Sequence, residues 1–128
     1  DTYLKFWYNY TNGENNKMSA GTYNFILEQG ATFNRILTVQ ENGSAMNLSG
    51  YSAASKFRST AESSSVAGTF SCTISNASGG QITMAMTSTA TGNLEEGIYL
   101  YDLEITSGSG AVTRLMQGKV TVNPEITR

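Results

Sequence analysis

Acidic side chains at close spacing are the first residues in this sequence that could do chemistry. Glu95 and Glu96 are adjacent and precede a glycine, whereas Asp102 and Glu104 lie two residues apart on one face of a predicted strand. Glycoside hydrolysis needs two carboxylates that face each other across a sugar, and hard cations take more oxygen ligands than two side chains supply. We therefore interpret the first pair as solvated turn charges. The second pair is interpreted as solubilising charges and cross-strand partners, with part of a cation site as the alternative.

Nucleophilic side chains are present, but the sequence has no histidine to activate them. Histidine is the usual general base and a common metal ligand, so its absence removes the standard Ser–His and Cys–His arrangements. The remaining possibility is a Ser–Lys arrangement, in which Lys56 would activate one of its serine neighbours. The single cysteine, Cys72, alternates with Phe70 and Ile74. This pattern predicts a buried small apolar side chain, with a reactive thiol as the alternative.

Composition narrows the function further. The 128 residues suit one domain with one core. Eight basic against ten acidic residues provide no basic patch for nucleic acid, and no apolar run approaches the roughly 18 residues of a membrane-spanning helix. Because no glycine-rich phosphate-binding motif occurs either, we predict a protein that is not an enzyme. We expect no catalytic, cofactor-binding or metal-binding residues and neither a nucleic-acid nor a membrane partner.

The N-terminal segment differs in composition from the rest of the chain. Residues 2–10 are rich in aromatic side chains, and residues 11–17 are polar and prone to turns. We therefore divide the chain into an aromatic N-terminal arm or linker at 1–17 and a single folded domain at 18–128. Three outcomes fit the arm: pairing as an extra strand on its own sheet, docking into a neighbouring subunit by strand addition, or a sugar-stacking surface. The candidate partner interface consists of Phe6, Trp7, Tyr8 and Tyr10.

From Gly21 onward, short alternating segments separated by turn residues predict one strand after another. The predicted strands are Thr22–Leu27, Thr32–Gln40, Ala45–Leu48, Tyr51–Arg58, Thr69–Ser75, Gln81–Met86, Gly97–Thr106 and Ala111–Val122. The fifth and sixth of these form one hairpin, the last two form another, and Ser88–Leu94 is the candidate helical turn. Strands at this spacing are typical of a sandwich or a small barrel.

The segment Leu94–Tyr101 favours the sandwich, because it resembles the turn into a strand that carries the tyrosine corner of immunoglobulin-like domains. Tyr99 is the expected corner residue, with its hydroxyl bonded to upstream backbone. Tyr101 takes the place of the second cysteine of antibody domains, and the alternative is simply two core tyrosines. We therefore predict an all-β fold, an immunoglobulin-like antiparallel β-sandwich of about seven strands without a disulfide. Uneven alternation in the last strand predicts a bulge at or near Gly118.

Several short segments occur in an order that resembles a family of small tailed-phage and prophage proteins. The residues that carry the resemblance are Gly21–Phe25, Glu28–Phe33, Asn47–Tyr51, Lys56–Arg58, Gly97–Ile105, Val112–Val122 and Pro124–Arg128. The pattern is similar to the N-terminal domain of phage baseplate upper proteins, and it covers essentially everything after Met18. We carry over no functional residues from the family, because its pattern consists of turn glycines and core aromatics.

The resemblance implies a bacteriophage virion structural protein that acts in assembly or attachment, in the baseplate, the tail or a head decoration. It implies other virion proteins and further copies of this chain as partners. It also implies synthesis in the cytoplasm of the bacterial host and a final location in the virion. The alternative function is a carbohydrate-binding or adhesion module, for which a host surface glycan is the expected ligand.

Overall fold

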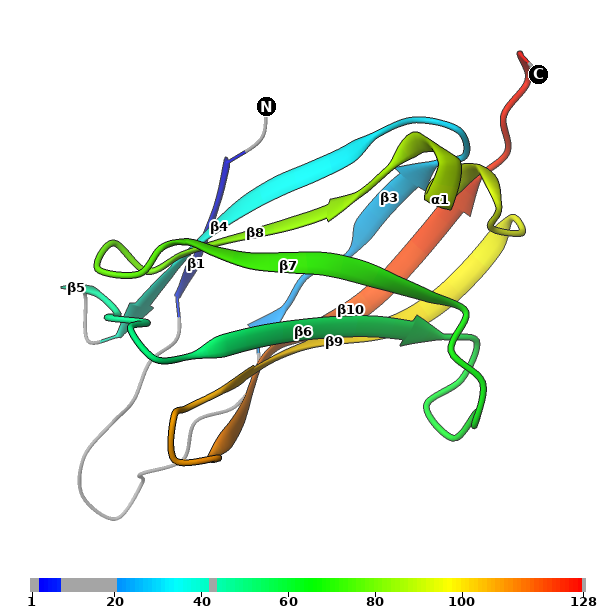
Figure 1. The fold of residues 1–128 in the computed structure, drawn as a ribbon. Coiled ribbons are helices and arrows are strands. Elements are labelled where there is room, and N and C mark those ends of the chain that lie inside the picture. Colours follow the sequence, from blue (N-terminus) through cyan, green and yellow to red (C-terminus); the bar gives the residue numbers. More distant parts are fainter. Residues whose placement is uncertain (1–2, 8–20, 42–43, 128) are drawn as a thin grey trace.

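A computed structural model describes residues 3–7, 21–41 and 44–127, and the regular elements of these residues are strands except for one short helix (Figure 1). In chain order the elements are β1 (Tyr3–Trp7), β2 (Gly21–Thr22), β3 (Phe25–Glu28), β4 (Phe33–Glu41), β5 (Ser44–Ala45), β6 (Ser52–Arg58), β7 (Gly68–Asn76), β8 (Gln81–Met86), α1 (Ser88–Gly92), β9 (Gly97–Thr106) and β10 (Val112–Asn123). The predicted helical turn is α1, which begins where the Thr87 hydroxyl accepts a hydrogen bond from the backbone N–H of Ala90. Within the described ranges, no helix is both long and apolar enough to cross a membrane.

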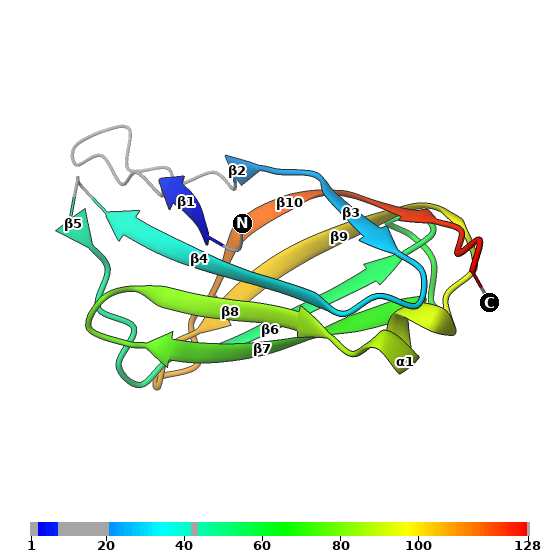
Figure 2. The same ribbon diagram turned by 90° about the horizontal axis from the view of Figure 1, so that it is seen from above.

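The strands form an immunoglobulin-like β-sandwich, as predicted. One layer contains β4, β8 and β7, and the facing layer contains β3, β10, β9 and β6 (Figures 1 and 2). The short strands β1 and β5 extend the first layer beside β4, and β2 extends the second beside β10. The layers are joined because β6 pairs with β7, from Ser55 opposite Phe70 to Phe57 opposite Gly68. One continuous sheet therefore curls over the core.

Both predicted hairpins are present. β7 pairs with β8 and β9 pairs with β10, each in antiparallel register. On β8, Ile82, Met84 and Met86 are all buried, so this strand presents its apolar face to the core as its alternation predicted.

The aromatic arm begins as an edge strand of the first layer. β1 runs parallel to β4, with Tyr3 opposite Ile36 and Trp7 opposite Gln40. This backbone arrangement is the first of the three outcomes considered for the arm. The proposed boundary at Met18 lies outside the described residues, so the division into arm and domain stays a prediction.

Aromatic rings fill the space between the two layers. Neighbouring rings in this cluster have centroids 5.2 to 6.2 Å apart, which is within the range of favourable aromatic pairs. The rings come from five different strands and belong to Phe25, Phe33, Phe57, Phe70 and Tyr101. Tyr101 is buried on β9, as predicted, whereas its correspondence to the second cysteine of antibody domains stays a prediction. The rings thus pack the two layers against each other.

The predicted tyrosine corner is also present. The Tyr99 hydroxyl donates to the Glu95 carbonyl at 2.7 Å, which fixes the turn between α1 and β9. Desolvation, followed by the nearby charge of Glu95, raises the pKa of Tyr99 above its ordinary value of 10.0. The hydroxyl therefore remains a donor at neutral pH.

The edge strand of the second layer is interrupted where it passes Gly118. β2 pairs with β10 up to Gln117, β3 pairs from Val120 onward, and the Tyr23 carbonyl between them accepts a hydrogen bond from the Tyr101 hydroxyl at 2.6 Å. Tyr101 is the cross-strand partner of Gly118, and a Cβ on Gly118 would overlap the Tyr23 carbonyl. Glycine is thus needed here because another backbone approaches closely.

The bulge predicted at or near Gly118 was misplaced. The register between β9 and β10 shifts between Arg114 and Met116, and Leu115 and Met116 are both buried although they are consecutive. The extra residue of the bulge allows two successive side chains to point into the core. Gly118 itself continues the ladder opposite Tyr101.

The end of the sandwich near α1 is closed by two polar side chains. The buried Thr91 hydroxyl accepts a hydrogen bond from the Gly30 N–H at 3.1 Å. The Gln29 amide donates to the Leu94 carbonyl at 2.7 Å and accepts from the Glu125 N–H at 2.9 Å. The turn after β3 is thereby tied to α1, to the corner and to the segment after β10.

Replacing Gly118 by alanine should destabilise the fold, because the new methyl group collides with backbone that cannot rotate away. We expect a loss of about 1–3 kcal/mol in the free energy of unfolding, the usual cost of overpacking, measured by urea denaturation. Gly108→Ala is the matched control, since its Cβ would lie 3.7 Å from the Gly50 carbonyl, an ordinary contact. Equal losses in the two variants would contradict this account of Gly118.

Tyr101→Phe should keep the ring in the core while leaving the Tyr23 carbonyl without its donor. Burial, with a smaller contribution from Tyr23, raises the pKa of Tyr101, so the wild-type hydroxyl donates throughout the neutral range. We expect a loss of about 1–3 kcal/mol, because a partly buried acceptor loses its hydrogen-bond donor. Tyr99→Phe removes an exposed hydrogen bond and should cost about 0.5–1.5 kcal/mol. The order of the two denaturation midpoints tests the assignment.

Candidate functional site

The outer face of the layer formed by β3, β10, β9 and β6 contains a groove of about 760 Å³. Backbone and side chains of β2, β6, β9 and β10 line it. Its charged residues are Lys56, Arg58, Asp102, Glu104, Arg114 and Lys119. Four of these are cations and two are anions, so the groove is net positive although the whole chain carries a net charge of −2.

Strand alternation positions these charges. On β9, Leu103 and Ile105 are buried, which turns Asp102 and Glu104 to the outer face as predicted. On β6, Ser55 is buried and Lys56 is exposed. The core side chains and the charged side chains of the groove therefore come from alternate residues of the same strands.

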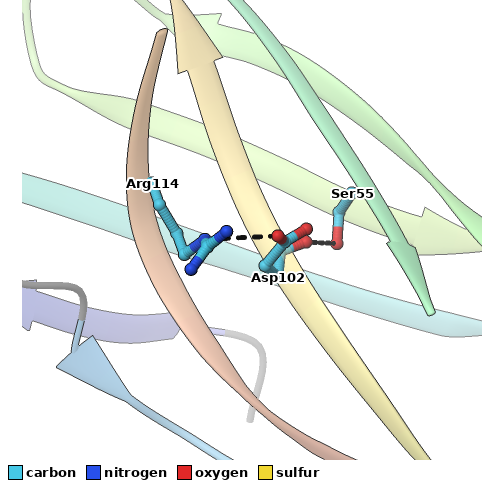
Figure 3. Close-up of polar contacts among 3 residues, drawn as sticks. All are labelled: Ser55, Asp102 and Arg114. Carbon is cyan, nitrogen blue, oxygen red and sulfur yellow. Dashed lines mark hydrogen bonds and ion pairs between the residues drawn. The ribbon is translucent and has the colours of Figure 1, made fainter. Parts of the chain in front are cut away.

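An ion pair crosses the floor of the groove. Figure 3 shows Arg114 on β10 beside Asp102 on β9, with Nε and Oδ2 3.3 Å apart, while the Ser55 hydroxyl donates to the Asp102 carbonyl at 2.6 Å. The two charged side chains remain 54% and 36% exposed, so the pair contributes at most about 1 kcal/mol to stability. The interpretation of Asp102 as a cross-strand partner is confirmed.

The other acidic and nucleophilic candidates are not brought together. Glu95 and Glu96 are both exposed in the turn before β9, as expected of solvated turn charges. Ser55 and Lys56 occupy opposite faces of β6, and the serine hydroxyl is already bonded to backbone. Among the residues that the structure describes, no three of the His, Cys, Asp and Glu side chains gather as metal ligands.

Exposed aliphatic side chains form a feature of this face that the sequence analysis missed. Ile26 on β3 is 57% exposed and Ile98 on β9 is 62% exposed, and Thr121 on β10 is the register partner of both. Leu100, also exposed, follows on β9. The sequence contains a signal for this feature, because the alternation of each strand places the isoleucine at 26 or 98 on its outward face. The strand register is what places them in one row.

The predicted partner-interface residues belong to the arm. The backbone of Phe6 and Trp7 lies in β1, opposite Val39 and Gln40 of β4. Tyr8 and Tyr10 lie outside the described residues. The role of the four side chains in docking stays a prediction.

Cys72 is half-buried on β7, and its Sγ lies 3.8 Å from the Phe70 carbonyl oxygen. Burial raises the pKa of the thiol from 9.0 to about 11. Because the thiolate is the reactive form, this environment favours the small apolar role over the reactive-thiol alternative.

Comparison of the sequence with models of known protein families gives no match, and comparison with curated proteins gives none at a significant level. Among solved structures, the N-terminal domain of phage TP901-1 ORF48 is similar, with a TM-score of 0.55 and 13% sequence identity. The similarity covers 96% of this chain and 99% of that one. The two chains share a fold. The expected resemblance to an N-terminal domain of a phage protein is thus present at the level of the fold.

A family 123 glycoside hydrolase from Clostridium perfringens also has a similar region, with 15% identity over 88% of this chain. That match covers 24% of the hydrolase chain at a TM-score of 0.41, which is too low to support an argument about fold or activity.

The thiol of Cys72 should react slowly in the folded protein. A pKa of about 11 instead of 9.0 leaves on the order of 100-fold less thiolate at pH 8. We expect labelling by a thiolate-specific disulfide reagent to accelerate by at least about tenfold in denaturant. Equal labelling rates in native and denaturing buffer at pH 8 would contradict the assignment.

The raised pKa of Cys72 also affects the pH dependence of folding stability. The contribution of the protonated thiol to the stability of the fold is complete below pH 9.0 and is lost as pH rises toward 11.

Proposed function

We propose that this chain is a structural component of a bacteriophage virion that acts in assembly or attachment and catalyses no reaction. The observation that supports this proposal is the fold shared with the phage domain over nearly the whole of both chains. Its position would be in the baseplate, the tail or a head decoration. Its partners would be other virion proteins and further copies of itself, after synthesis in the cytoplasm of the bacterial host.

The groove favours a binding role over a catalytic one. Its two acids lie two residues apart on one strand, and Asp102 is engaged by Arg114. Hydrolysis of a glycoside needs carboxylates on opposite sides of the bond, and a strand that presents both from one side does not supply them. A surface groove with charged side chains beside exposed aliphatic residues is typical of a surface that contacts another protein.

A second candidate function, carbohydrate binding or adhesion, is favoured by the amide and hydroxyl groups of the groove. Thr22, Asn24 and Gln117 line it beside Asp102 and Arg114, and such groups can hydrogen-bond sugar hydroxyls. A glycan array separates the two functions. Glycan binding by purified chain that is absent from phage particles would favour adhesion.

The virion proposal is tested by asking whether the chain is part of the particle. Phage particles from a host that carries the gene are purified on a density gradient, and peptides of this chain are quantified against the major capsid protein. We expect a fixed ratio of the two proteins across the particle band. Recovery of the chain only among unsedimented cell proteins would overturn the proposal.

The arm is tested in the same experiment with a variant that keeps its length. Replacing Phe6, Trp7, Tyr8 and Tyr10 by serine removes the aromatic anchors that usually dominate interface energy while the backbone of β1 can still pair with β4. We expect incorporation to fall by roughly tenfold. Unchanged incorporation of a folded variant would show that the arm does not dock, without affecting the virion proposal.

A further inference from the structure

The outer face of β3, β10 and β9 carries an exposed apolar row that the fold itself does not need. The row consists of Ile26, Thr121 and Ile98, which are register partners on three adjacent strands. The core is built from the opposite phase, in which Phe25, Leu27 and Tyr101 are buried. Two isoleucines more than half exposed therefore remain in water unless another surface covers them.

Negative charge lies at one end of this row's strands. Glu28 is two residues beyond Ile26 on the same face of β3, and its carboxylate accepts a hydrogen bond from the Asn123 amide at 3.2 Å. Glu95 and Glu96, both exposed, immediately precede β9 at this same end of the sheet. The groups beyond the apolar row are therefore acidic.

Positive charge lies on the other side of the row. Lys119 is two residues before Thr121 on β10 and is exposed, and the described residues hold no acidic partner in an ion pair with it. Its register partner on β9 is Leu100, which in turn pairs with Arg58 on β6. At about 3.3 Å per residue, the acidic and basic groups lie at similar distances on either side of the apolar row, roughly 6–7 Å away.

We propose that two copies of this chain associate through this face, outer surface against outer surface, about a twofold axis that runs along the apolar row. Such a rotation reverses the strand direction, so the acidic end of each copy lies over the basic groups of the other. Glu28 and Glu96 of one copy then approach the other copy's Lys119 and Arg58, while Ile26 and Ile98 meet their own counterparts. A twofold interface must be self-complementary in this way, and two sheet faces pack about 10 Å apart.

The order of the charges is what selects a second copy as the occupant. An interface with a different protein needs complementarity only to that protein. On this face, acidic groups, the apolar row and basic groups follow one another along the strands, and this order is complementary to itself when the strand direction is reversed. This inference deepens the homo-oligomeric part of the proposed function, because it names the surface and symmetry of the association. It can be measured on purified chain and does not depend on the particle experiment.

The test is the solution mass of the purified full chain, measured by light scattering over a range of concentrations and ionic strengths. We expect a shift from 13.7 kDa toward twice that mass as concentration rises. Added salt should weaken the dimer, because exposed charge pairs are screened. A chain that stays monomeric up to about millimolar concentration overturns the proposal, because even a weak specific interface populates the dimer at that concentration.

Charge reversal gives the sharper test. Glu28→Lys and Lys119→Glu should each raise the dimer dissociation constant by roughly tenfold, because like charges then face each other. The double variant carries both changes in every copy, so the complementarity is restored and the dissociation constant should return to near the wild-type value. Failure of the double variant to recover, with circular dichroism showing that it is folded, overturns the twofold arrangement.

Ile98→Asp tests the apolar row and should also raise the dissociation constant by at least about tenfold. Val112→Asp is its matched control, because Val112 is 60% exposed on β10 but lies at the opposite end of the β9–β10 hairpin. The control should dimerise like the wild type. A dimer that survives Ile98→Asp and is lost in Val112→Asp would place the interface elsewhere and overturn the proposal. Loss of virion incorporation alone would bear only on the proposed function.

Discussion

The hydrogen bond from the Tyr101 hydroxyl to the Tyr23 carbonyl is the contact on which the second layer of the sandwich depends. The carbonyl turns inward where the edge strand passes Gly118, and it fills the space that a side chain there would occupy. The ring of Tyr101 also packs against Phe25 and Phe70. One side chain thus holds the edge strand, a central strand and the opposite layer together. This contact requires the hydroxyl and the buried ring of Tyr101 together with the glycine at 118 on the neighbouring strand.

The same strands build both the core and the outer face, and they do so with alternate residues. On β9, Tyr101, Leu103 and Ile105 point inward, whereas the intervening residues present charge and aliphatic surface to the outside. Because the two sets do not compete for space, substitutions on the outer face leave the ring contacts intact. A module of this kind can vary in what it contacts while its packing stays constant.

Local pattern predicted most of the fold, because alternation and turn residues are sufficient to define hairpins. The corner at Tyr99 was predicted because its interaction spans four residues. The bulge was misplaced because a glycine was read as the irregularity, whereas the consecutive buried residues Leu115 and Met116 mark it. The outer apolar row could not be predicted from one segment. It depends on the pairing of Ile26 and Thr121, which are far apart in the chain and are aligned only by the fold.

The aromatic cluster has a consequence for where this sandwich can fold. With a single cysteine in the sequence, its layers are joined by ring packing and by the β6–β7 pairing, neither of which responds to oxidants or reductants. Disulfide-linked sandwiches need an oxidising compartment to gain their stability. The contacts that join these two layers are therefore the same in a reducing and in an oxidising medium.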